Sequence, residues 1–176
     1  MGQKIVLTIV FVFLLILGGR VEIPLEPVPF ILTDFFVFLG ALWFRPRFFA
    51  FCVLLFLSLG ALGVPVYADG AGGFKHLVGP TSGYLFGYLL AGFTVSVAKE
   101  TFKKFMPRVL IVFLGYYFLF VLGVSSLMLV ANLSLQEAVN VGAKPFVLSM
   151  HLKALGAVLV VHVLNTLGLR SGQDIW

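Results

Sequence analysis

Long apolar runs separated by short polar links form the pattern of this sequence. Six runs are candidate membrane-spanning helices, at about Ile5–Gly19, Phe30–Phe44, Phe48–Gly63, Gly83–Ala98, Val109–Ala131 and Phe146–Leu169. Several of them are about 15 residues long, whereas a full crossing of a bilayer takes roughly 20 residues. We therefore expect some helices to extend into the flanking links. The pattern predicts an all-α integral membrane protein with six transmembrane helices, in which residues 1–176 form a single polytopic domain.

The first apolar run has features of a secretory signal. Lys4 precedes it, and the pair Gly18-Gly19 follows it. A secretory signal is normally followed by a soluble protein, but here further apolar runs follow. We interpret this run as an uncleaved first helix.

Composition supports a membrane environment. The 176 residues are 61% hydrophobic and 11% charged, and the mean hydropathy is +1.12. A soluble domain contains about 25% charged residues, and a disordered chain is polar and rich in charge. Both classes are therefore excluded. Cys52 is the single cysteine and lies inside an apolar run, so no disulfide framework and no cysteine metal site are expected.

Basic residues gather on one side of the predicted membrane. With six spans, that side holds Lys4, Arg45, Arg47, Lys99, Lys103, Lys104, Arg108 and Arg170. The other side holds Arg20, Lys75, Lys144 and Lys153. Because positive residues favour the cytoplasmic side, this asymmetry predicts that both termini are cytoplasmic. The formal net charge of +5 is thereby explained by topology, and no nucleic-acid partner is expected.

Polar residues cluster where the second, fourth and sixth spans begin, on the predicted external side. They are Thr33 and Asp34, then Thr81, Ser82 and Tyr84, then His151 and Lys153. Helix N-termini carry free N–H groups and a positive dipole end, which together favour an anion. A lysine costs about 2.5–3.5 kcal/mol at the centre of a membrane, so Lys153 is a candidate to bind a carboxylate. The alternative is that Lys153 reaches the nearby interface.

The external links are rich in turn-forming residues. The link from Arg20 to Pro29 contains three prolines. The segment Asp69-Gly70-Ala71-Gly72-Gly73 is either a flexible lid flanked by Tyr67 and Phe74 or a simple surface turn. Small residues at Gly83, Gly87 and Ala91 predict close packing of the fourth span against another helix.

Signatures of enzymes are missing from the sequence. It contains no close carboxylate pair within a predicted span, no His-Glu-x-x-His motif, no nucleophile elbow and no phosphate loop. Three histidines and seven acidic residues are scattered over different segments. We therefore expect no enzymatic activity, no metal site and no cofactor.

Four segments together resemble one known family. They are Ile23-Pro24-Leu25-Glu26-Pro27-Val28-Pro29-Phe30, Leu59-Gly60-Ala61-Leu62-Gly63-Val64-Pro65-Val66-Tyr67, Gly79-Pro80-Thr81-Ser82-Gly83-Tyr84-Leu85-Phe86-Gly87, and Lys144-Pro145-Phe146 followed by Lys153. In this order they resemble BioY proteins, the biotin-specific S components of energy-coupling-factor (ECF) transporters, over most of residues 20–165.

The resemblance implies a fold, a ligand and partners. It implies six helices and a pocket near the external face that the first and third loops close. It further implies capture of biotin at a prokaryotic cytoplasmic (cell) membrane. The implied partners are an ECF transmembrane coupling subunit, contacted by the first helix, and two ATPase subunits.

Three departures separate this sequence from the family pattern. The family's Thr-x-Gln after Pro-Phe is replaced by Ile31 and Thr33, and its Asp before the last helix's lysine is replaced by Met150. Losing an amide and an acid removes expected hydrogen bonds to the ureido ring, and such losses alter specificity. His151, Asp34 and Asp69 are candidates to compensate. The third departure is in the first helix, where the family's Ala-x-x-x-Ala gives way to bulky rows such as Ile5, Ile9, Phe13 and Leu17.

These observations lead to a biotin-type S component as our hypothesis. Lys153 and the N-terminus of the fourth span would hold the ligand carboxylate, and Tyr67, Phe74 and Tyr84 would enclose its rings. The full set of expected ligand-binding residues is Thr33, Asp34, Tyr67, Asp69, Phe74, Thr81, Tyr84, His151 and Lys153. Two alternatives remain open: an S component for another small carboxylate such as lipoate or a biotin precursor, and a structural membrane protein without a ligand.

Overall fold

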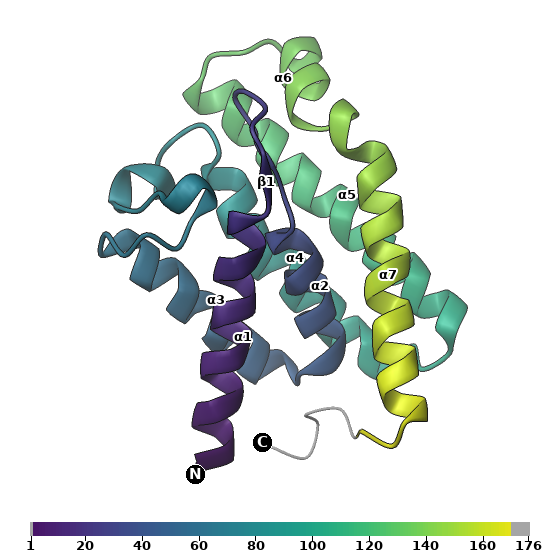
Figure 1. The fold of residues 1–176 in the computed structure, drawn as a ribbon. Coiled ribbons are helices and arrows are strands. Elements are labelled where there is room, and N and C mark those ends of the chain that lie inside the picture. Colours follow the sequence, from purple (N-terminus) through teal and green to yellow (C-terminus); the bar gives the residue numbers. More distant parts are fainter. Residues whose placement is uncertain (1, 170–176) are drawn as a thin grey trace.

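Helices form almost all of the structure (Figure 1). The computed structural model describes residues 2–169. Its longer helices are α1 (Gly2–Arg20), α2 (Thr33–Trp43), α3 (Pro46–Ala61), α4 (Ser82–Thr101), α5 (Phe105–Val130) and α7 (Val147–Thr166). The links contain a short helix, α6 (Leu135–Gly142), and three 3-10 helices, η1 (Ala68–Gly70), η2 (Phe74–Leu77) and η3 (Lys144–Phe146). The strands β1 (Glu22–Ile23) and β2 (Phe30–Ile31) pair as an antiparallel hairpin.

Each of the six predicted apolar runs overlaps one of the longer helices, which confirms the all-helical fold class. Three stretches of the described chain are long and apolar enough to cross a membrane: α1, α5 and Leu135–Thr166. The helix α2 has only 11 residues, because the start of its predicted run pairs into the β hairpin. The sequence reading missed α6, which begins at a capping box between Ser134 and Glu137 and has too few apolar residues to resemble a span.

The helix α4 lies at the centre of the bundle, in contact with α2, α3 and α5. The predicted face of small residues is what brings it close to α5. A Cβ atom at Gly83 would collide with the carbonyl oxygen of Leu122, and one at Gly87 would meet the side chain of Leu119. Because no larger residue fits at Gly83 without moving the backbone of α5, the two helices pack with their backbones in near contact there.

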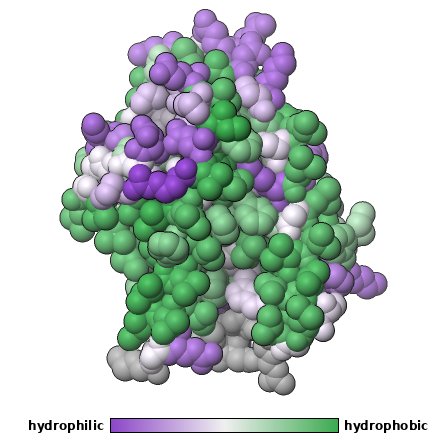
Figure 2. All heavy atoms as spheres, viewed as in Figure 1, coloured by the Kyte–Doolittle hydropathy of each residue, from purple (hydrophilic) through white to green (hydrophobic). Residues whose placement is uncertain are grey.

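The outer faces of the bundle are apolar. On α1 the exposed hydrophobic side chains are Ile5, Val6, Ile9, Val10, Phe13 and Leu17. Figure 2 shows hydrophobic residues covering the sides of the molecule, while hydrophilic residues gather around the loops at one end. Exposed apolar surface of this extent is unfavourable in water and favourable in lipid. The surface therefore agrees with an integral membrane protein.

At the other end of the bundle, a buried lysine forms hydrogen bonds to the end of α2. Lys99 of α4 is 1% exposed, and its Nζ donates hydrogen bonds to the carbonyl oxygen of Ala41, at 2.8 Å, and to that of Phe44. The Ser96 hydroxyl donates to the same Phe44 oxygen at 3.0 Å. These donors satisfy carbonyl groups that the end of α2 leaves without helical partners.

Candidate ligand-binding site

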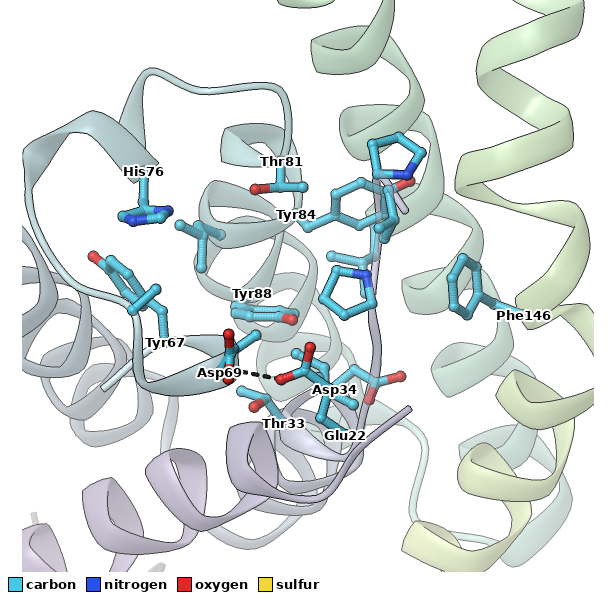
Figure 3. A pocket seen from close by; sticks show the side chains of 18 of the residues that line it. Glu22, Thr33, Asp34, Tyr67, Asp69, His76, Thr81, Tyr84, Tyr88 and Phe146 are labelled. Carbon is cyan, nitrogen blue, oxygen red and sulfur yellow. Dashed lines mark hydrogen bonds between the residues drawn. The ribbon is translucent and has the colours of Figure 1, made fainter. Parts of the chain in front are cut away.

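A cavity of about 560 Å³ lies at the loop-rich end of the bundle, opposite Gly2 (Figure 3). Its volume is within the range of roughly 300–1,000 Å³ found for small-molecule sites. The aromatic residues of its wall are Phe56, Tyr67, Tyr84, Tyr88, Phe120 and Phe146. The charged residues of its wall are Glu22, Glu26, Asp34, Asp69 and Lys153. Apolar walls with a few polar groups suit a small, partly apolar ligand.

An ion pair between α2 and α7 forms part of this wall. The Nζ atom of Lys153 lies 2.9 Å from both carboxylate oxygens of Asp34 and 2.7 Å from the carbonyl oxygen of Ile31. It also lies 4.2 Å from the ring centroid of Phe30. An ammonium group has three protons to donate, and here three acceptor atoms surround it. Burial of Lys153 is tolerated because its charge is paired and fully hydrogen-bonded.

Three predicted site residues use their hydroxyl groups to hold the protein together. Thr33 donates to the carbonyl oxygen of Leu15 at 3.1 Å, and Tyr67 donates to that of Leu57 at 2.8 Å. Tyr84 donates to the carbonyl oxygen of Gly142 at 2.7 Å. These residues therefore offer a ligand their carbon surfaces, while their donors support the walls of the cavity.

Tyr67 anchors the loop between α3 and α4. Its ring lies directly over Gly60, where a Cβ atom would collide with it. Its backbone N–H donates a hydrogen bond to the carbonyl oxygen of Ala71. The backbone N–H of Gly73 donates another to the carbonyl oxygen of Gly60, at the end of α3. Burial raises the pKa of the Tyr67 hydroxyl, so the group stays a neutral donor at ordinary pH.

Two hydrogen bonds join this loop to the N-terminal segment. The backbone N–H of Asp69 donates to Oε2 of Glu22 at 2.6 Å. The Arg20 guanidinium donates through Nη2 to the carbonyl oxygen of Pro65 at 2.8 Å. The first and third loops thus meet over the cavity, in the arrangement that the resemblance implied.

The structure brings most of the predicted site residues together. Those that line the cavity are Thr33, Asp34, Tyr67, Asp69, Thr81, Tyr84 and Lys153. Phe74 and His151 are not among the lining residues. Phe74 is 64% exposed in η2. On α7, Nδ1 of His151 lies 2.6 Å from the carbonyl oxygen of Val147, and its ring packs against Phe113.

Sequence reasoning missed Tyr88, which lines the cavity from α4. Tyr88 follows Thr81 by seven residues and Tyr84 by four, so the three residues share one face of the helix. This spacing was available in the sequence. Glu22, Glu26 and His76 were also missed, and they carry no such periodic signal because they lie in irregular links.

Among the three residues proposed to compensate for the lost family acid, Asp34 is the one that contacts Lys153. Met150, which stands where the family has the acid, is buried at 1% exposure. Its side chain carries no carboxylate that could pair with the lysine. The carboxylate beside the lysine therefore comes from the start of α2 instead of from α7.

The fold and the site together define a class: an integral membrane protein built of helices, with a loop-covered cavity of small-molecule size. Within that class, the chain belongs to the BioY family, whose model matches residues 2–169.

Curated relatives and a solved structure resemble the chain over most of its length. The biotin transporter BioY of Thermotoga maritima is 36% identical over 151 residues, which are 86% of this chain and 89% of the relative. The probable biotin transporter BioY of Pyrococcus horikoshii is 30% identical over 164 residues, or 93% of this chain and 97% of the relative. The crystal structure of an S component for biotin from an ECF-type ABC transporter superposes with a TM-score of 0.87 at 24% identity, covering 93% of this chain and 91% of that one. This last likeness shows a shared fold.

Proposed function

We propose that this protein captures biotin and takes it up through the membrane as the S component of an ECF-type transporter. The observation that carries the proposal is a ligand-sized cavity, lined by aromatic rings and one ion pair, in a member of the BioY family. Its relatives in Thermotoga maritima and Pyrococcus horikoshii bear the names biotin transporter and probable biotin transporter.

The chemistry of biotin matches the wall of the cavity. Biotin combines an apolar bicycle, a polar ureido edge and a tail that ends in a carboxylate. Tyr67 and Tyr84 present ring surface to the cavity because their hydroxyls are bonded to backbone elsewhere. Burial of the bicycle against such rings is the main favourable contribution to binding.

The carboxylate of the tail belongs, in this proposal, at the N-terminus of α4. Thr81 immediately precedes that helix and lines the cavity. A helix N-terminus favours an anion. Lys153 was the other candidate for this role, but its three protons already face Ile31 and Asp34. The N-terminus of α4 therefore remains as the anion-binding part of the original hypothesis.

The same proposal includes an orientation, a location and partners. Both termini lie in the cytoplasm, and the cavity opens to the outside of a prokaryotic cell membrane, as the distribution of Lys and Arg favours. A transmembrane coupling subunit and two ATPases supply the energy for release. The exposed apolar face of α1, which includes Ile9 and Phe13, is the contact surface assigned to the coupling subunit.

Equilibrium binding to the purified protein in detergent tests this function. We expect saturable biotin binding that excess lipoate does not displace. Biotin is also expected to raise the thermal unfolding temperature, because a ligand of the folded state stabilises it. Failure of biotin to bind the folded protein would overturn the proposal. Displacement by lipoate would favour the alternative of another small carboxylate, which the replacements Ile31, Thr33 and Met150 motivate.

A further inference from the structure

A basic link joins α4 to α5 at the end of the bundle opposite the cavity. It contains Lys103 and Lys104, and Arg108 follows in the first turns of α5. Of the six acidic residues in positions 2–169, four line the cavity and Glu137 lies in α6, so Glu100 alone belongs to this end. Within the same residues none of the three cations forms an ion pair. The link therefore carries a positive charge that the described chain leaves unpaired.

Arg108 is held in a fixed orientation over this link. Its Nε donates a hydrogen bond to the carbonyl oxygen of Phe102 at 3.2 Å, and its side chain is half-buried, whereas Lys103 and Lys104 are exposed. A guanidinium has five N–H donors, and in the described residues its Nη groups have no side-chain or backbone acceptor. A planar fork that is already oriented is well suited to bind two oxygens of a phosphate.

Exposed apolar side chains border the cations. Phe102 is 44% exposed and Met106 is 71% exposed. Leu110 and Leu114, at 58% and 59% exposure, follow Met106 at intervals of four residues and so continue the same face of α5. This face is part of the apolar outer surface of the bundle. The cations thus lie at the margin of the surface that contacts lipid.

Two further features add hydrogen-bond donors at this margin. The first turn of α5 contains no acidic residue and has no side-chain cap, so its N–H groups add to the positive potential. In Figure 1 the start of α5 lies beside the C-terminal half of α7, where the rings of Phe105 and His162 pack with centroids 5.5 Å apart. His162 is exposed, and its ring brings an N–H donor from a second helix.

We propose that this basic link binds the phosphate diester of an anionic phospholipid headgroup, with phosphatidylglycerol as the representative ligand. Arg108 donates to the phosphate oxygens through its Nη groups, and Lys103 and Lys104 add charge. Phe102 and Met106 contact the acyl chains. Basic residues beside a spanning helix attract anionic lipids in general. The proposal goes beyond the proposed function and does not depend on it, since none of these residues lines the cavity.

A role in membrane topology alone predicts a different behaviour. Topology depends on the number of positive charges in a link, so Arg108→Lys leaves it unchanged. A lysine is a point charge and cannot replace the planar fork of a guanidinium. Sensitivity of lipid binding to this charge-preserving substitution therefore distinguishes a built site from a general excess of charge.

The experiment titrates the purified protein, in a neutral detergent, with short-chain phosphatidylglycerol or with phosphatidylcholine of the same chain length. Native mass spectrometry counts the bound lipids, and thermal unfolding measures stabilisation by a ligand of the folded state. Inorganic phosphate and glycerol 3-phosphate are added in separate arms. We expect saturable binding of phosphatidylglycerol at least about tenfold tighter than that of phosphatidylcholine, weakened by salt. Neither soluble anion is expected to stabilise the protein at the same concentration.

Three variants locate the site. Arg108→Lys is expected to weaken phosphatidylglycerol binding by about three- to tenfold, because the bidentate contact is lost. The double variant Lys103→Gln with Lys104→Gln is expected to weaken it by about tenfold or more, at about fivefold for each charge. Lys75→Gln with Lys144→Gln is the matched control, since both lysines are exposed and lie in the links of the loop-rich end. Its affinity for the lipid is expected to stay within about twofold of the wild type.

Each possible result decides for or against the site. Equal affinity for the two lipids overturns the proposal, and so does a preference that persists in both Arg108→Lys and the Lys103 and Lys104 variant. Equal loss in the control variant would mean general attraction of charge and also overturn it. Stabilisation by inorganic phosphate as strong as that by phosphatidylglycerol would overturn the lipid assignment.

Folding and ligand capture are checked separately from lipid binding. The unfolding temperature without lipid shows whether each variant is folded. Should Arg108→Lys fail to fold, the Lys103 and Lys104 variant still decides, because both side chains are exposed. Biotin affinity is expected to be unchanged in every variant, so failure of the lipid site and failure of the proposed function are distinguishable.

Discussion

The hydroxyl of Tyr84 donates a 2.7 Å hydrogen bond to the carbonyl oxygen of Gly142, so the first turn of α4 is tied to the end of α6. The Tyr84 ring fits against Gly123, where a Cβ atom would collide with it. One side chain thus joins three segments at the loop-rich end of the bundle, and it lines the cavity as well.

Replacing Tyr84 with Phe removes this hydrogen bond. The carbonyl oxygen of Gly142 then lacks the hydroxyl donor that it has in the wild type. We expect the free energy of unfolding to fall by about 1–3 kcal/mol. Thermal unfolding in detergent measures this loss, and hydrogen exchange should show faster opening of α6. Tyr117→Phe is the control, because Tyr117 is 50% exposed. Equal stability of the two variants would contradict a structural role for the hydroxyl.

The ion pair between Asp34 and Lys153 predicts a non-additive pattern of stability. Either Asp34→Ala or Lys153→Met alone leaves a buried charge without its partner, at a cost of about 3–5 kcal/mol. The double variant removes both charges and is expected to be more stable than either single variant. A double-mutant cycle from thermal unfolding measures the coupling. Additive losses would mean that the two side chains contribute independently.

Lys99 at the opposite end supports α2 and is remote from the cavity. Lys99→Met removes the donors to Ala41 and Phe44, and we expect a loss of roughly 1.5–3 kcal/mol in the free energy of unfolding. Biotin affinity of the folded variant is expected to stay within about twofold of the wild type. Lys103→Met is the matched control, since Lys103 is exposed. A large change in affinity with unchanged stability would contradict this assignment.

The start of α6 is expected to respond to pH through Glu137. Hydrogen bonds from the Ser134 hydroxyl and backbone N–H lower the pKa of this carboxyl below its ordinary value of 4.5. Because the folded pKa is depressed, the stabilisation is fully present above pH 4.5 and is lost as the pH falls through the folded pKa. Hydrogen exchange of α6, corrected for intrinsic rates, should therefore show more opening at low pH. Glu137→Gln is expected to abolish that dependence, and its persistence in this variant would assign it to another group.

Apolar runs were sufficient to predict the six longer helices, because lipid exposure requires a continuous hydrophobic surface. They did not reveal α6, whose stability comes from a local cap and not from an apolar run. Lys153 was identified as a site residue because a charge is costly at membrane depth. Its pairing with Asp34, 119 residues away in sequence, depends on how α2 and α7 pack, and one sequence does not specify that.

The positions of single side chains were predicted less well. His151 precedes Lys153 by two residues, and residues so spaced point to different sides of a helix. It therefore lies against Phe113 and away from the cavity. Tyr88 shares the face of Thr81 and Tyr84, so helical periodicity alone would have identified it. Phe74 was chosen for its place beside a glycine-rich segment, but its side chain in η2 is 64% exposed and does not line the cavity.

The contacts over the cavity are unequal in strength. The bonds from Asp69 to Glu22 and from Arg20 to Pro65 are exposed to solvent, and each contributes only about 0.5–1.5 kcal/mol. Tyr67, by contrast, is 4% exposed and fixed over Gly60. The two exposed contacts are therefore expected to break more readily than the packing of Tyr67 over Gly60, so the backbone at Asp69 would separate from Glu22 while Tyr67 stays in place.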